Sequence, residues 1–169
     1  MAPSATTPDR MSLTTVATRE IIFDVEGYTV TKLMSDGRGY FESDKFTVGG
    51  YDWAVRYYPE RGGVYVAVTL VLISGLNEAD AAGGQKEAGG GVGVRFACAL
   101  QDRHGERPPE RCRSASRVFS ECGHEWGFWK YTTHDVLDDP DFLVGDCFTL
   151  VCTVSVLRKP RFCVVDVAA

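Results

Sequence analysis

An alternating segment near the end of the chain constrains the fold more than any other feature of the sequence. From Phe148 to Val156 large apolar residues fall on every second position, which places them on one face of an extended strand. The segment therefore predicts a β-strand with a buried face, and it puts Cys152 in the core. The residues of that face are Phe148, Leu150, Cys152, Val154 and Val156.

A second segment predicts a strand that is covered on both faces. Residues 64–73 are apolar at nearly every position, as in a central strand of a sheet. Earlier in the chain, Gly49-Gly50 predicts a tight hairpin, because glycine adopts the positive φ that such a turn requires. Just after this turn Trp53 alternates with other apolar side chains, including Tyr57, which predicts that Trp53 is buried.

Short segments of β type recur between turn signals, whereas helical periodicity is nearly absent. The one predicted helix covers Thr133 to Leu137, with Thr132 or Thr133 as its N-cap and Pro140 after its end. This pattern predicts an all-β sandwich of two sheets with one short helix. The remaining strands are predicted at residues 20–25, 40–47, 52–58, 92–100, 117–119 and 128–131.

The chain carries no sign of secretion or of a membrane span. Its polar start lacks the order of a signal peptide, and its longest apolar segment is too short to cross a bilayer. The six cysteines are scattered at unequal spacings and no N-glycosylation sequon is present, which favours free thiols in a reducing compartment. We expect a protein of the nucleus or cytoplasm without a membrane partner. Residues 77–91 are of low complexity and predict a flexible loop.

The charge of the chain argues against nucleic acid as a partner. The net charge is −5 and the sequence pI is about 5.2, whereas phosphate binding needs a basic surface. The one cluster of basic residues contains Arg107, Arg111 and Arg113, and we interpret it as part of a solvated loop.

No segment predicts a catalytic centre, a metal site or a cofactor. Gly84 and Gly89 have the spacing of a phosphate loop, but Gly90 stands where such a loop needs a lysine. Around Cys122 and His124 no Cys-x-x-Cys pair is present, and a structural zinc site needs four ligands. We therefore expect neither an enzyme nor a metalloprotein.

The aromatic residues gather in one short segment. Four of the six residues from Trp126 to Tyr131 are aromatic, and alternation along a strand would bury about two of them. Exposed aromatic side chains are typical of protein-binding surfaces, because they bury a large area at a small entropic cost. The residues alone leave open whether Trp126 and Phe128 lie in the core or on such a surface.

Several linked segments carry a family resemblance. The first group comprises residues 27–28, 46–53 and 56–59, and the second comprises residues 126–128, 142–143 and 146–156. In order and spacing they resemble a MATH domain, the meprin and TRAF homology domain. The resemblance extends from about Thr18 to about Leu157, and residues 48–53 are most similar to the MATH domains of plant MATH–BTB proteins.

This resemblance implies an eight-stranded antiparallel β-sandwich at residues 18–158, between a disordered segment at 1–17 and a tail at 159–169. It also implies a function. In such adaptors the MATH domain binds a short linear degron of a substrate protein, while a BTB domain engages a cullin–RING ubiquitin ligase. A BTB domain is absent from this sequence, so we expect contact with a cullin only through a BTB domain outside it.

The resemblance further implies a shallow groove for a Ser/Thr-containing peptide that adds along a strand edge. Glu125 would accept hydrogen bonds from peptide hydroxyls. Thr69 and Arg117 stand where the family's animal adaptor has tyrosines, and His124 and Trp129 replace lysines. These substitutions predict a different motif, with an acidic residue tolerated near Arg117. The groove residues are Thr69, Phe96, Arg117, His124, Glu125, Trp126, Gly127, Phe128 and Trp129.

Two other functions stay open at this point. One is a MATH-only decoy or scaffold that binds proteins without recruiting a ligase. The other is an enzyme, such as a cysteine hydrolase or the substrate domain of a deubiquitinase, for which Cys112 or Cys122 would be tested as nucleophile. No motif in the sequence supports the enzyme.

Overall fold

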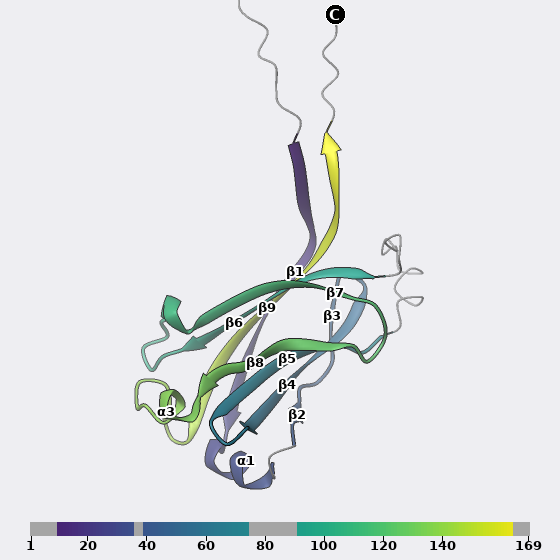
Figure 1. The fold of residues 1–169 in the computed structure, drawn as a ribbon. Helices are drawn as coiled ribbons and strands as arrows, with labels where there is room; N and C mark the ends of the chain where they lie inside the picture. The colour runs from purple at the N-terminus through teal and green to yellow at the C-terminus, as the bar shows by residue number, and fades with distance from the viewer. Residues whose placement is uncertain (1–9, 36–38, 75–90, 164–169) are drawn as a thin grey trace, which may run out of the picture.

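A computed structural model describes residues 10–35, 39–74 and 91–163, which form two antiparallel sheets packed face to face (Figure 1). The first sheet has the order β1-β9-β6-β7, and the second has the order β2-β4-β5-β8 with β3 also paired to β4. The predicted all-β sandwich is confirmed, with nine strands in the described residues where eight were expected. The strands of the first sheet are β1 (Arg10–Glu26), β6 (Val92–Gln101), β7 (Cys112–Phe119) and β9 (Cys147–Cys163). Those of the second are β2 (Phe41–Glu42), β3 (Phe46–Val48), β4 (Tyr51–Arg61), β5 (Tyr65–Leu72) and β8 (Glu125–Thr133).

The predicted central strand and the predicted tight hairpin are both confirmed. β5 lies between β4 and β8 and is buried at every position from Val66 to Leu72. The Gly49-Gly50 hairpin joins β3 to β4, with φ angles of 63° and 84°. The strand predicted at 40–47 is instead two short strands. It is interrupted where the Ser43 backbone N–H and side chain both hydrogen-bond to the backbone of Val55.

The prediction of a single helix is wrong. The predicted one is present as α3 (His134–Leu137), capped by the Thr133 side chain, and a 3-10 turn, η1 (Pro109–Arg111), precedes β7. A further helix, α1 (Tyr28–Met34), has no side-chain cap and buries only Tyr28. Asp146 holds its start from a distant part of the chain: the Asp146 carbonyl accepts from Tyr28 N at 2.9 Å and its carboxylate accepts from the Thr29 hydroxyl at 2.7 Å. The sequence around α1 therefore gave no local signal.

The paired strands extend beyond the predicted domain limits of 18 and 158. β1 begins at Arg10 and β9 ends at Cys163, and these two residues pair with each other. Residues 1–9 and most of the predicted loop at 77–91 lie outside the described residues. Within the described ranges, no helix is long and apolar enough to span a membrane.

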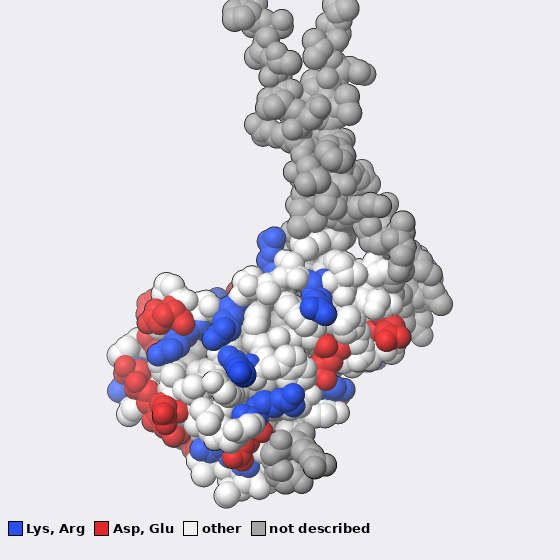
Figure 2. All heavy atoms as spheres, viewed as in Figure 1, with Lys and Arg blue, Asp and Glu red and all other residues white. Residues whose placement is uncertain are grey.

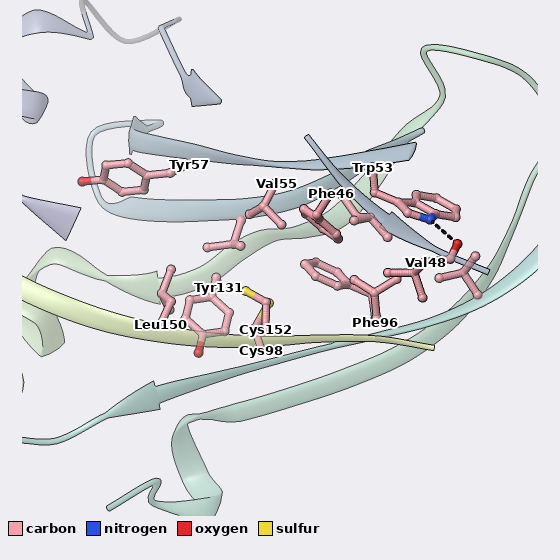
Figure 3. Packing of buried hydrophobic residues seen from close by; sticks show 14 of the residues in the cluster. Phe46, Val48, Trp53, Val55, Tyr57, Phe96, Cys98, Tyr131, Leu150 and Cys152 are labelled. Carbon is pink, nitrogen blue, oxygen red and sulfur yellow. Dashed lines mark hydrogen bonds between the residues drawn. The ribbon is translucent and has the colours of Figure 1, made fainter. Parts of the chain in front are cut away.

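One hydrophobic core fills the space between the sheets (Figure 3). Trp53 is fully buried, as predicted, and its indole N–H donates to the Val48 carbonyl at 3.2 Å. Cys152 is also buried, with its Sγ 3.5 Å from Cys98 Sγ on the neighbouring strand. Burial raises the pKa of the Cys98 thiol, so this thiol is kept in the protonated, unreactive form.

We expect Tyr28→Phe to raise the free energy of unfolding by about 1 kcal/mol. The Tyr28 hydroxyl is buried, and no hydrogen-bond partner for it lies among the described residues. Removing it takes away an unsatisfied polar group while the ring keeps its edge contact with Phe148 at 5.7 Å between centroids. Urea denaturation measures the change. The matched control is Tyr57→Phe, which loses a hydroxyl bonded to Thr31 and is expected to destabilise; a loss of stability in both variants would contradict the prediction.

Candidate functional site

Two edge strands, β7 and β8, lie on the same side of the sandwich. β7 is the last strand of the first sheet and β8 is the last strand of the second (Figure 1). Within the described residues each pairs with one neighbour only, β7 with β6 and β8 with β5. Each strand therefore has a free edge on this side. We call the strip of surface formed by these two edges and the side chains between them the β7–β8 cleft.

The ladder between β5 and β8 decides which backbone groups reach the free edge. Leu72 N donates to the His124 carbonyl, so His124 faces β5, and the register pairs Leu70 with Trp126. Residues of an antiparallel strand alternate between facing the partner and facing away. The backbone N–H and C=O groups of Glu125 and Gly127 therefore point toward the free edge. An extended peptide can pair with groups of this kind.

Four of the predicted groove residues meet on the inner side of the cleft. The Phe96 and Phe128 rings are stacked, with centroids 5.7 Å apart, and Trp126 lies 6.0 Å from Phe128. The Arg117 guanidinium lies over Trp126 at 5.9 Å. Phe96 is buried, whereas Trp126 and Phe128 are half-buried. The sequence left open whether Trp126 and Phe128 lie in the core or on an exposed surface. The structure shows an intermediate position, because these rings pack on the core and still border the cleft.

Three other predicted residues lie on the outer face of the second sheet. Thr69 and Glu125 are hydrogen-bonded side chain to side chain, at 2.6 Å. Trp129 packs against Tyr58 with centroids 5.3 Å apart, and the Arg61 guanidinium lies 4.4 Å above its ring. The predicted groove residues therefore occupy both faces of β8. Those on the inner face border the β7–β8 cleft, whereas Thr69, Glu125 and Trp129 lie on the other face of the sheet.

Glu125 is the centre of a polar network that the sequence did not reveal. One carboxylate oxygen pairs with Arg56 at 2.9 Å, and the other accepts from the hydroxyls of Thr69 and Tyr58. Arg56 also pairs with Glu42 at 3.0 Å. Burial and the hydrogen bond to Glu125 raise the pKa of Tyr58 to about 12, so this phenol stays protonated and donates.

This network changes the role expected for Glu125. A carboxylate offers about four acceptor positions, and residues of the chain itself fill three of them. The acid is therefore held in place, and little of its capacity is left for peptide hydroxyls. The sequence did not link Tyr58 and Arg56 to Glu125, because only the order β4-β5-β8 in the folded sheet brings these side chains together.

Gly127 lies where the chain has no space for a side chain. A Cβ at this position would be 2.5 Å from the Val68 carbonyl oxygen and 2.6 Å from Thr69 Cα. Both neighbours are backbone atoms of β5, so neither can rotate away. Gly127 thus allows β8 to approach β5 closely beside the buried Thr69 side chain.

His124 closes the turn that leads into β8. Its Nδ1 accepts from Ser120 N at 3.2 Å, and its ring packs against Phe119 at 4.9 Å between centroids. The ring is half-buried. This residue therefore shapes one end of the cleft, at the mouth that Trp126 borders.

The interpretation of Arg107, Arg111 and Arg113 as one solvated loop is wrong for Arg113. β7 begins at Cys112, five residues before the predicted strand, so Arg113 and Arg117 share the face of β7 that borders the cleft. Figure 2 shows basic side chains gathered over the strip of the surface where β7 and β8 lie. The β7–β8 cleft is basic although the whole chain is acidic.

The family model of the MATH domain matches residues 20–154. The chain belongs to the MATH domain family. MATH domains bind partner proteins, which agrees with a cleft that offers a free strand edge and aromatic side chains. Within the described ranges, no group of His, Cys, Asp and Glu side chains could hold a metal ion.

This MATH domain is similar to plant proteins that carry a second named domain. It is 28% identical over 148 residues to the BTB/POZ and MATH domain-containing protein 3 of Arabidopsis thaliana, covering 80% of the chain and 33% of that protein. It is 29% identical over 173 residues to protein 4 of the same series, covering 95% of the chain and 34% of the relative. The chain thus spans about a third of the length of these relatives.

Proposed function

We propose that this MATH domain captures partner proteins by adding an extended segment of the partner to the free edge of β8. The observation that carries the proposal is the edge itself: the backbone of Glu125 and Gly127 faces outward beside the half-buried rings of Trp126 and Phe128. Backbone pairing would supply affinity, and an apolar peptide side chain between the rings and Arg117 would supply specificity.

We further propose that the bound segment is a Ser/Thr-containing linear motif of a substrate protein. The remaining acceptor position of Glu125 would take one peptide hydroxyl. Because the relatives are named for a BTB/POZ domain as well as for a MATH domain, the proposal extends to substrate selection for a cullin–RING ubiquitin ligase. In that role a BTB domain would contact the cullin while the β7–β8 cleft holds the substrate as a degron.

Trp126→Ala tests this function. We expect the variant to lose at least about tenfold in affinity for captured partners, because central aromatic anchors supply much of the binding energy in such sites. A pull-down from plant extract, with wild type and variant in parallel and mass spectrometry as readout, identifies the partners. Peptides scanned from them then give the affinity ratio.

The matched control is Val118→Ala. Val118 lies on β7 next to Arg117 but is 57% exposed on the opposite face of the strand, so it is expected to leave capture unchanged. If Trp126→Ala recovers the same proteins as the wild type, the cleft is not the binding site. If a BTB domain continues the chain, recovery of substrates without any cullin by that longer protein would favour a decoy or scaffold.

A further inference from the structure

A hollow lies at the opposite end of the β7–β8 cleft from Trp126, between η1, β7, β8 and the start of α3. Its charged lining residues are Arg111, Arg113, Lys130 and Glu110, and its floor includes Tyr131 and Leu100. Tyr131 and Leu100 are buried, while Arg113 and Lys130 are exposed. The hollow is therefore a polar rim above an apolar floor, and it is continuous with the cleft through β7 and β8.

Side-chain hydrogen bonds hold the basic groups at this end. Arg113 Nε donates to the Tyr131 carbonyl at 3.1 Å, and the Tyr131 hydroxyl donates to the Arg111 carbonyl at 2.9 Å. These two bonds tie β7 and η1 to β8. Lys130 Nζ lies 5.3 Å from the centroid of the Tyr65 ring. The Arg113 guanidinium is thus fixed at one nitrogen and keeps its terminal N–H groups for a ligand.

The hollow has an excess of positive charge. Three cationic side chains face one carboxylate, that of Glu110. In the described part of the chain, no ion pair involves Arg111, Arg113 or Lys130. Burial raises the pKa of the Tyr131 phenol, so the floor stays neutral and does not offset these charges. Such a site favours an anion, and guanidinium groups match carboxylate and phosphate in geometry.

We infer that this hollow is a subsite for an anionic side chain of the bound peptide, either a phosphorylated serine or threonine or an acidic residue. The inference rests on the proposed function. Arg117, beside the apolar mouth, and Arg113 are four residues apart on the same face of β7, which corresponds to about 13 Å along a strand. An extended peptide crosses this distance in about four residues. The ligand therefore carries an apolar anchor and an anionic residue about four positions apart.

Fluorescence anisotropy with peptide libraries tests this spacing. Each library fixes one leucine and places one phosphoserine at a chosen position before or after it, with uncharged residues elsewhere. Parallel libraries carry glutamate or serine at the same position. We expect phosphoserine to raise affinity about tenfold over serine at one spacing near four, on one side of the leucine only. Glutamate is expected to give part of this gain, and added salt is expected to weaken both.

Arg113→Gln with Lys130→Gln is expected to abolish the gain while leaving the serine library bound. Lys130→Gln alone changes an exposed residue and is expected to reduce the phosphoserine gain. This single variant can still be measured if the double variant misfolds. The control is Arg95→Gln, which removes a cation from the exposed outer face of the first sheet. The anionic subsite alone would be overturned if serine peptides bind through Trp126 and phosphoserine adds no affinity. It would also be overturned if the phosphoserine gain remains in the double variant. Equal binding to wild type and Trp126→Ala would overturn the proposed function instead.

Discussion

Trp53→Ala is expected to lower the free energy of unfolding by about 4 kcal/mol, since removal of a buried tryptophan costs about 3–5 kcal/mol. The Trp53 side chain is fully buried and packs edge-on against Phe119, with centroids 5.3 Å apart. Its indole N–H also fixes the Val48 carbonyl beside the Gly49-Gly50 hairpin. The substitution therefore leaves a cavity and removes a buried hydrogen bond together. Urea denaturation followed by far-UV circular dichroism measures the loss.

Two other variants show whether the loss of stability in Trp53→Ala comes from its buried position. Trp53→Phe keeps part of the ring and is expected to lose less than half as much as Trp53→Ala. Trp126→Ala removes the same chemical group from a half-buried position, so we expect a smaller loss of stability there. Equal losses for Trp53→Ala and Trp126→Ala would show that Trp126 belongs to the core, and the aromatic mouth of the cleft would then have no separate role.

The sandwich could be predicted because its signals are local. Alternation along β9, continuous apolar sequence in β5 and a Gly-Gly hairpin each depend on neighbouring residues. The helix α1 was missed for the opposite reason. Asp146, more than a hundred positions away, satisfies its first turn, and Asp146 itself adopts a positive φ of 58°. No pattern around α1 contains this information.

In the candidate site, too, some features could be predicted from the sequence and others depend on residues that are distant in the chain. The family resemblance placed the segment from His124 to Trp129 at the cleft, and the structure puts Arg117 and Phe96 beside it. The network around Glu125 was invisible, because it joins side chains from four strands that only the sheet register aligns. Arg113 was misread because β7 begins earlier than its apolar pattern does, at exposed residues.

Gly127→Ala is expected to lower the free energy of unfolding by about 3 kcal/mol, at the upper end of the cost of overpacking. The added methyl group would lie 2.5 Å from the Val68 carbonyl oxygen, so β8 must move away from β5 to admit it. That movement strains the Thr69–Glu125 hydrogen bond and shifts the free edge to which a peptide would add. Denaturation measures the first effect, and peptide anisotropy at a temperature where the variant is folded measures the second.

Gly93→Ala is the matched control, because it adds the same methyl group to a glycine in another strand of the sandwich. A Cβ at Gly93 would meet only Leu157 atoms, at 3.7 Å and beyond, which is ordinary packing distance. We expect no loss of stability there, since alanine restricts the unfolded chain more than glycine does. If the two variants were equally stable, β8 could move from β5 at little cost. The close approach of β8 to β5 would then not be what positions the free edge of β8. Unchanged peptide affinity in a folded Gly127→Ala domain would lead to the same conclusion.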